Sequence, residues 1–420
     1  SAEQAGRLDR PGRNKILDAC SGDVVREVLA DSERQTLAIS VAEGHGVTVL
    51  DRHDQVIRNL EDYGLVRARE LVPDPEEIER RRAEGRGLTR PEIAVLLAHA
   101  KNLVHELLLR GDIPDDPGVA DVLAGYFPES LRAPYAAEIS SHPLGREIIA
   151  TRLANDLIDR VGPGFIYRVE DRTGADPEQA IRAVLVVKQL LGLDELWDGL
   201  ALYPVAPTVP VRQALERTLE HNVAWLVRRK SRLGAIDAEV DVFQSTVASL
   251  HAAMCAQRPL EEGSSLDRDL HALAELGAPT ELLTALRAVS RMHAVLALAA
   301  AAAESGFDVV DLAREYARTG EALGLSWLYS TITITMADPH WVQLAKAALR
   351  DELSTLTVAI ATEILAAGSM EVWTREHRDA LARAGAAYAG LAGSTEVDVA
   401  MLTVGVQILR DLCRAVGVRG

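Results

Sequence analysis

Aromatic side chains are scarce in this sequence and make up only 4% of its 420 residues. Hydrophobic residues nevertheless amount to 48%, so Leu, Ala and Val supply most of the apolar volume. This composition is typical of helices packed on helices, and its balance of hydrophobic and charged residues is that of a globular protein. At this length we expect two or three domains with a large buried core.

Cysteine is rarer still, with three residues that lie far apart. Cys20, Cys255 and Cys413 form no C-x-x-C pair and are odd in number. They therefore indicate neither a zinc site nor a disulfide framework. Thiols of this kind fit a reducing compartment, and we expect a cytoplasmic protein.

Basic residues are outnumbered by acidic ones, which gives a formal net charge of −17. A nucleic-acid-binding protein needs a basic face to neutralise phosphates, so nucleic acid is not an expected partner. The longest apolar run, at 293–303, is too short and too rich in alanine to cross a bilayer. The N-terminus has no signal-peptide pattern, and we expect a soluble protein without membrane contact.

Familiar catalytic motifs are absent as well. The sequence contains no G-x-S-x-G elbow, no H-E-x-x-H and no Walker sequence. The glycines of "GRGLTR" at 85–90 fail the dinucleotide fingerprint, because Arg90 replaces the third glycine and no alternating strand precedes them. We therefore assign no catalytic, cofactor-binding or metal-binding residue, and we expect this segment to be inactive alone.

Helix-start signals, in contrast, are frequent. Thr89 and Glu92 have the spacing of a capping box, and Pro91 falls in the first turn, where a missing N–H costs nothing. Apolar residues then recur from Ile93 to Leu108 with the period of a helix. This chemistry predicts a well-started helix rather than a phosphate-binding loop.

Two Asp-Pro pairs repeat the signal, in "DPEE" at 74–77 and "DPEQ" at 176–179, and "ADPH" at 337–340 is a weaker third. The only strand-like run, "STITITM" at 330–336, has no partner nearby, and we assign it to the frayed end of a helix. The prediction is an all-α fold of one or more multi-helix bundles with no substantial sheet. The expected helices are 22–31, 33–62, 75–84, 90–110, 143–161, 165–173, 177–191, 207–231, 238–256, 266–276, 279–303, 307–321, 339–367 and 374–416.

Clusters of Pro and Gly indicate loops at 111–118, 203–210 and 257–265. The last is polar and flanked by long helices, so it is the preferred domain boundary. We expect a helical connector at 1–72, a helical core domain at 73–260 and a C-terminal helical bundle at 261–420.

Histidines offer two candidate metal sites, and both are weak. His99 and His105 are six residues apart and so lie on opposite sides of one helix, where they are expected to be ordinary, partly exposed residues. "RHD" at 52–54 is similar to the His-Asp pair of helical metal-dependent phosphohydrolases. Such a site needs distant ligands as well, and the only earlier histidine is His45.

Two further patterns have a structural and a functional interpretation. "VGPGF" at 161–165 could present backbone N–H groups to an anion, although a tight turn between helices is favoured. Asp156 and Asp159 are spaced to face one side of a helix, close to Arg152 and Asn155. Ion pairs between helices are the favoured interpretation of this group.

Several long strings together resemble one family. They are "GRGLTRPEIAVLLAHAKN" at 85–102, "GYFPESLR" at 125–132, "HPLGREIIATRLANDLIDRVGPGFIYRVEDRTGA" at 142–175 and "AALRDEL" at 347–353. They closely resemble the region that follows the catalytic domain in the large bacterial NAD-specific glutamate dehydrogenases. Residues 6–40 resemble the segment by which that family leaves its catalytic domain.

The resemblance implies a parent enzyme that oxidatively deaminates L-glutamate to 2-oxoglutarate and ammonia with NAD. Its lysine-bearing substrate segment and its Rossmann region have no counterpart here, so no catalytic or cofactor residue is carried over. The implied role of this chain is structural, as a hinge or in assembly. The implied partners are the catalytic domain of the same polypeptide and further copies in a homo-oligomer.

Two other classes of function stay open. The chain could be an independent helical interaction module without enzymatic activity, and the absence of Met at position 1 favours a cut chain over this alternative. A helical hydrolase would need several His and acidic residues to converge on a metal, and the eleven histidines are too scattered in the sequence to show that.

Overall fold

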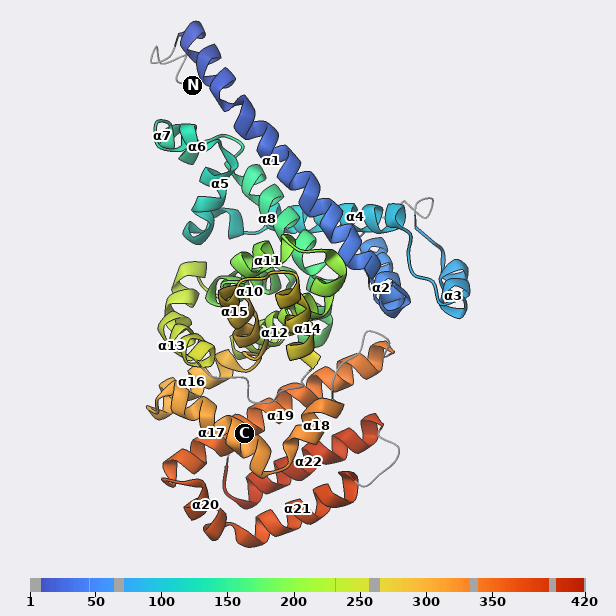
Figure 1. Ribbon diagram of the computed structural model, residues 1–420, viewed down its shortest axis with the longest axis vertical. Coiled ribbons are helices and arrows are strands. Elements are labelled where there is room, and N and C mark those ends of the chain that lie inside the picture. The colour runs from blue at the N-terminus through green and yellow to red at the C-terminus, as the bar shows by residue number, and fades with distance from the viewer. Residues whose placement is uncertain are drawn as a thin grey trace.

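The protein is an elongated stack of helices (Figure 1). The structure, a computed structural model, describes residues 9–44, 46–63, 72–230, 232–256, 265–332, 339–392 and 398–418. Within these ranges the chain forms 22 α-helices and three short 3-10 helices, with no β-strand. The predicted all-α class is therefore confirmed.

A long helix, α1, forms one end of the stack, and its N-terminal part projects beyond the neighbouring helices (Figure 1). The sequence predicted two helices here, at 22–31 and 33–62, which is wrong: one helix runs to Gly44, and a 3-10 turn separates it from the next. Helical periodicity continues through the turn, so the pattern alone does not reveal the break. The elements of this part are α1 (Arg10–Gly44), η1 (Gly46–Val49), α2 (Leu50–Asp62), α3 (Pro75–Ala83) and α4 (Arg90–Arg110).

The start of α4 confirms the predicted capping box. The Glu92 carboxylate accepts hydrogen bonds from the Thr89 N–H at 2.7 Å and the Thr89 hydroxyl at 2.8 Å. Arg81 of α3 binds the same carboxylate with two nitrogens, at 2.6 and 2.9 Å. A Cβ atom on Gly87 would lie 2.7 Å from the Gly46 carbonyl oxygen, so this glycine permits close packing of two loops.

The middle of the stack is the main apolar core. Asp176 caps α10 as predicted, accepting the Glu178 N–H at 2.9 Å. The elements are η2 (Ile113–Asp115), η3 (Pro117–Val119), α5 (Ala120–Tyr126), α6 (Glu129–Arg132), α7 (Ala136–Ser140), α8 (Gly145–Val161), α9 (Phe165–Thr173), α10 (Pro177–Leu190), α11 (Leu193–Ala201), α12 (Val205–Arg229), α13 (Ile236–Ala256), α14 (Ser265–Glu275), α15 (Thr280–Ser290) and α16 (Val295–Ser305).

Two predictions in this region are corrected. The expected loop at 203–210 is largely helical, because α12 begins at Val205 and accommodates Pro210 in its second turn. The expected helix at 279–303 is broken into α15 and α16. The buried Asn222 of α12 stabilises the break: its amide donates to the Met292 carbonyl at 3.0 Å and accepts the Leu296 N–H at 3.2 Å.

The C-terminal helices form the other end of the stack (Figure 1). The expected single helix at 374–416 is wrong, since a turn at His377 separates α20 from α21 and a further helix begins at Val399. Ser330 and Thr331 end a helix as expected, while 333–336 of the strand-like run lie outside the described residues. The elements are α17 (Val309–Ala322), α18 (Leu325–Thr331), α19 (His340–Ala366), α20 (Met370–Glu376), α21 (Arg378–Ala392) and α22 (Val399–Ala415).

Buried apolar side chains fall into two clusters. The first is formed mainly by residues from Ala38 to Leu312, and the second by residues from Leu325 to Val418. Helix α19 belongs to both, because Val358 and Ala361 pack into the first cluster while other residues of this helix pack into the second. The predicted boundary at 257–265 lies almost entirely outside the described residues, and the three-domain division stays a prediction.

Candidate functional site

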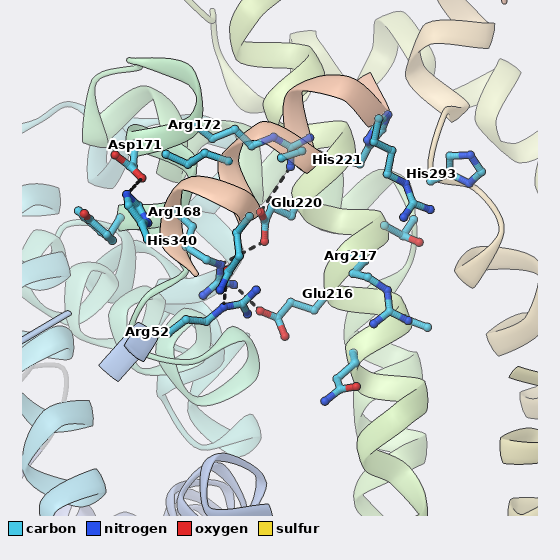
Figure 2. A pocket seen from close by; sticks show the side chains of 18 of the residues that line it. Arg52, Arg168, Asp171, Arg172, Glu216, Arg217, Glu220, His221, His293 and His340 are labelled. Carbon is cyan, nitrogen blue, oxygen red and sulfur yellow. Dashed lines mark hydrogen bonds and ion pairs between the residues drawn. The ribbon is translucent and has the colours of Figure 1, made fainter. Parts of the chain in front are cut away.

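A cavity of about 590 Å³ lies between helices of the first apolar cluster and the first part of α19. Helices α2, α9, α12 and α19 supply most of its lining, together with the turn after α15 (Figure 2). We call it the junction cavity. Helix α19 starts at this cavity and continues among the C-terminal helices. A ligand here would therefore contact α19 together with α2 and α12.

Helical spacing brings the polar side chains to the cavity. On α12 they recur at intervals of three or four residues, and the same intervals occur on α9 and α19. The polar lining residues of these helices are Gln213, Glu216, Arg217, Thr218, Glu220 and His221 on α12, Tyr167, Arg168, Asp171 and Arg172 on α9, and His340, Gln343 and Arg350 on α19.

Part of this charge is compensated inside the protein. Arg168 pairs with Glu216 and, at 3.2 Å, with Glu220. Arg172 contacts Glu220 at 3.4 Å and also pairs with Asp351. Burial acts to raise the pKa of Glu220, but the guanidinium groups of Arg168 and Arg172 hold it below its usual value. Glu220 therefore remains ionised.

A histidine and an aspartate form a second pair beside the cavity. His221 Nδ1 lies 2.9 Å from an Asp351 carboxylate oxygen. Burial lowers the pKa of His221, and the hydrogen bond to Asp351 offsets only part of that effect. Asp351 also binds Arg172 and Arg228. Burial acts to raise the pKa of Asp351, but the hydrogen bond with His221 and the two guanidinium groups hold it well below the usual range.

Three arginines of the cavity form no such ion pair, although nearby carboxylates offset part of their charge from a longer distance. Among the described residues, no carboxylate oxygen lies within 4.0 Å of the guanidinium nitrogens of Arg52, Arg217 or Arg350. Arg52 Nε donates to the Gln343 side-chain oxygen at 3.1 Å, which is a neutral partner. Burial and the nearby Arg168 lower the pKa of Arg52 to about 10. Burial also lowers the pKa values of Arg217 and Arg350.

A neutral hydrogen-bond network continues from the cavity towards the C-terminal helices. Burial and the nearby Arg350 lower the pKa of His293 to about 3, so this imidazole is uncharged. The Tyr316 hydroxyl lies 3.4 Å from His293 Nε2, 2.9 Å from the Tyr329 hydroxyl and 3.2 Å from the Ser354 hydroxyl. The network thus links the turn after α15 with α17, α18 and α19.

The arrangement suits anion binding better than acyl transfer. The Ser290 hydroxyl is buried and has no hydrogen-bond partner among the described residues, so it is not activated by the His221–Asp351 pair as a nucleophile would be. The planar guanidinium forks, in contrast, match carboxylate and phosphate groups. What the cavity offers chemically is positive potential in a partly open space.

The structure assembles neither of the two histidine arrangements considered above. His99 and His105 are both partly buried side chains on α4, as expected. His53 is buried on α2, and Asp54 pairs with Arg58 of the same helix at 2.5 Å. His45 lies outside the described residues. Within the described ranges, no three His, Cys, Asp or Glu side chains come together as metal ligands would.

The remaining patterns have the favoured structural roles. Residues 161–165 form a tight turn between α8 and α9, and a Cβ on Gly164 would lie 2.8 Å from Val56. Asp156 pairs with Lys188 of α10 at 2.6 Å, and Asp159 with Lys101 of α4 at 2.7 Å. The two carboxylates therefore join α8 to different helices and form no common site.

The described residues contain no Rossmann-type dinucleotide motif. A dinucleotide fold needs a strand, a glycine-rich loop and a helix, and no strand occurs in the described ranges. Gly87, the second glycine of the "GRG" string at 85–87, is packed against Gly46.

No single described helix is long and apolar enough to span a membrane. Two helix pairs, α15 with α16 and α19 with α20, meet these criteria only when taken together, and each pair is strongly bent.

Sequence reasoning missed the residues that form the junction cavity. Arg52 was considered only as a neighbour of His53, and Arg217, Arg350 and Asn222 were not singled out. A signal exists in the charged residues that recur every three or four positions on α9 and α12. On its own, that signal cannot be distinguished from a solvated helix face.

Comparison with known proteins identifies the family. A model of the family described as "Glutamate dehydrogenase, C-terminal" matches residues 85–411. The NAD-specific glutamate dehydrogenase of Mycobacterium tuberculosis is 27% identical over 428 residues, covering 99% of this chain and 26% of that protein. Its counterpart from Pseudomonas aeruginosa is 28% identical over 432 residues, covering 98% of this chain and 26% of that protein.

A third relative, the NAD-specific glutamate dehydrogenase of Halomonas elongata, is 28% identical over 365 residues, which cover 86% of this chain and 23% of that protein. The chain thus spans about a quarter of the length of the curated relatives it matches. Because the family match extends over most of its residues, the chain belongs to the glutamate dehydrogenase C-terminal family.

Proposed function

We propose that this chain is the C-terminal helical part of an NAD-dependent glutamate dehydrogenase. In the proposed parent, an upstream catalytic region converts L-glutamate, NAD⁺ and water into 2-oxoglutarate, ammonia and NADH. The helical part would pack against that region, shape the hinge that closes its cleft, or support a homo-oligomer. Closure can limit turnover, so a part without catalytic residues can still change the rate. Three free thiols and the high acidic charge support a cytoplasmic protein that binds no nucleic acid.

The observation that carries this proposal is an exposed apolar stripe on the projecting part of α1. Leu17, Val24 and Val28 fall on one face of this helix, with Val25 and Leu29 beside them, and each is 49–59% exposed. Contiguous apolar surface of this kind usually marks an interaction site. The stripe lies within residues 6–40, which resemble the segment leaving the family's catalytic domain. We therefore assign it to contact with that domain.

The other half of α1 is anchored to the body of the protein. Ala38 is buried in the first apolar cluster, and Arg90 of α4 binds Glu43 at 2.5 Å and Ser40 at 3.1 Å. Helix α1 also packs against α8 and α12. A partner held by the stripe would therefore be coupled to α12, which lines the junction cavity.

Introducing negative charge into the stripe tests the proposal. We expect V24E/V28E to weaken the association between this chain and the separately produced catalytic region of the same polypeptide by about tenfold or more, because two buried apolar contacts are lost. The matched control is Val242→Glu on α13, which alters a similarly exposed residue, 60% accessible, far from α1. Sedimentation velocity measures the association. Equal binding by the stripe variant and the control would overturn the proposal.

Reading the gene upstream of Ser1 separates this proposal from an independent helical interaction module. An open reading frame that continues into a Rossmann pattern supports the dehydrogenase. A start codon next to Ser1 would instead identify a free-standing module, for which the stripe would serve another partner.

A further inference from the structure

The junction cavity concentrates positive charge in a strongly acidic protein. Its lining includes five arginines, Arg52, Arg168, Arg172, Arg217 and Arg350, against three carboxylates, Asp171, Glu216 and Glu220. Asp171 is itself engaged by His340 at 3.3 Å. The ion pairs described above use the remaining carboxylates for Arg168 and Arg172. An excess of cations is therefore left over, although the whole chain carries −17.

The uncompensated arginines act on one another. Arg350 lowers the pKa of Arg217 in addition to the effect of burial, and Arg217 contributes to lowering that of Arg52. Like charges inside a partly buried space repel each other. Glu216 and Glu220 offset part of this repulsion at Arg52 and Arg217, and Asp351 at Arg350, but none of these carboxylates forms an ion pair with them. Arginine stays protonated even so, which means that the cavity keeps its positive potential at neutral pH.

The three arginines also come from different parts of the fold. Arg52 belongs to α2 and Arg217 to α12, both in the first apolar cluster, whereas Arg350 belongs to α19. Figure 2 shows Arg52 and Arg217 on separate helices that border the same cavity. The buried Ser290 hydroxyl, which lacks a partner among the described residues, adds a neutral donor to the lining.

We infer that the junction cavity binds a small metabolite with at least two negative charges, whose carboxylate or phosphate groups are held by Arg52, Arg217 and Arg350. A cavity of about 590 Å³ accommodates a molecule of that size. Bound there, the anion joins α19 to α2 and α12. It would thereby fix the C-terminal helices relative to the rest of the chain, independently of whether a catalytic domain is attached.

Binding of simple probe anions to the purified chain tests this inference. Inorganic pyrophosphate and succinate serve as the phosphate and carboxylate probes, each compared with sodium chloride at equal ionic strength. We expect at least one probe to raise the melting temperature and to give saturable heat in calorimetry. We also expect hydrogen exchange to slow in the first turns of α19. A response to pyrophosphate alone identifies a phosphate ligand, and a response to succinate alone identifies a carboxylate ligand.

Variants assign the binding to the cavity. Arg217→Gln and Arg350→Gln should each weaken binding of the active probe about tenfold or more, because each removes a charge-assisted hydrogen bond. Arg383→Gln, which alters an exposed arginine on α21, should leave binding unchanged. Cooperative melting of each variant without probe shows that it is folded. The inference is overturned if no probe exceeds the chloride control, or if both cavity variants bind as the unaltered chain does.

Discussion

Two groups of partly buried charges in this protein are organised in opposite ways. In the first, which we call the balanced cluster, Asp156, Arg160, Lys188 and Asp194 join α8, α10 and α11. Lys188 contacts Asp156 at 2.6 Å and Asp194 at 3.1 Å, and Arg160 contacts Asp156 at 2.6 Å. In the junction cavity, Arg52, Arg217 and Arg350 have no carboxylate partner among the described residues.

The difference separates a structural role from a binding role. Charges taken out of water destabilise a fold unless opposite charges and hydrogen bonds compensate them. The balanced cluster meets that condition with side chains of the protein itself, so it holds three helices together. The junction cavity does not meet it. Uncompensated charge in a cleft is a feature of functional sites, where a ligand supplies the missing counter-charge.

The largest expected effect comes from a substitution that breaks the balanced cluster. Asp156→Ala removes a carboxylate shared by Arg160 and Lys188 and leaves two cations without their nearest partner. Because the Asp156 side chain keeps 29% exposure, we expect a loss of about 2–3 kcal/mol rather than the full effect of a fully buried pair. Urea unfolding followed by circular dichroism measures it. A loss below about 1 kcal/mol would show that this cluster is not stabilising.

The second prediction has the opposite sign. Arg350→Gln removes a cation with no carboxylate partner, so the unfolding free energy without ligand should stay unchanged or rise by about 1 kcal/mol. The same urea experiment applies. A loss as large as that of Asp156→Ala would mean that Arg350 is compensated by the protein after all, and the contrast between the two groups would disappear.

Glu170 on α9 provides the reverse case, a carboxylate without a cation within 4.0 Å among the described residues. Burial, with a contribution from Asp176, raises its pKa from 4.5 to about 7. Since the folded state holds this proton more tightly than the unfolded state, the stabilisation is present below pH 4.5 and is lost as the pH rises through 7.

Glu170→Gln should therefore melt higher than the unaltered chain at pH 8 and equally at pH 4.5. Solvent screening limits the difference at high pH to under about 1 kcal/mol. Melting curves of both proteins across this pH range measure the difference. A constant offset at every pH would contradict the assignment to Glu170.

The smallest effect belongs to an exposed ion pair, which serves as the reference for the others. Arg314 and Asp311 on α17 are 2.5 Å apart, and their side chains are 59% and 58% exposed. Arg314→Gln should change the unfolding free energy by less than about 0.5 kcal/mol, because water and salt screen the pair. A larger change in the urea midpoint would mean that exposed charges in this protein are worth more than the comparison assumes.

The parts of the fold that follow from local chemistry could be predicted from the sequence. Helices α4 and α9 begin and end at the expected residues because capping side chains, Pro91 and Gly174 act within one turn. The break between α15 and α16 could not be predicted, since Asn222 stabilises it from a helix about seventy residues earlier in the chain. Periodicity within one segment carries no information about such a contact.

The junction cavity could not be predicted from the sequence for the same reason. Arg52, Arg217 and Arg350 are separated by long stretches of chain, and each is an ordinary charged position on its own helix. Only the packing of α2, α12 and α19 brings them to one space. What the sequence could supply was the family, through long strings of specific order, and the expectation of ion pairs around Asp156 and Asp159.

The most direct test of the proposed function is a glutamate-dependent NAD⁺ reduction assay. It compares this chain alone, the separately produced catalytic region alone, and the two mixed. We predict no NADH from this chain alone, and a changed rate for the catalytic region when the chain is added, with the same preference for glutamate. NADH production by this chain alone, or an unchanged rate on mixing, would contradict the account.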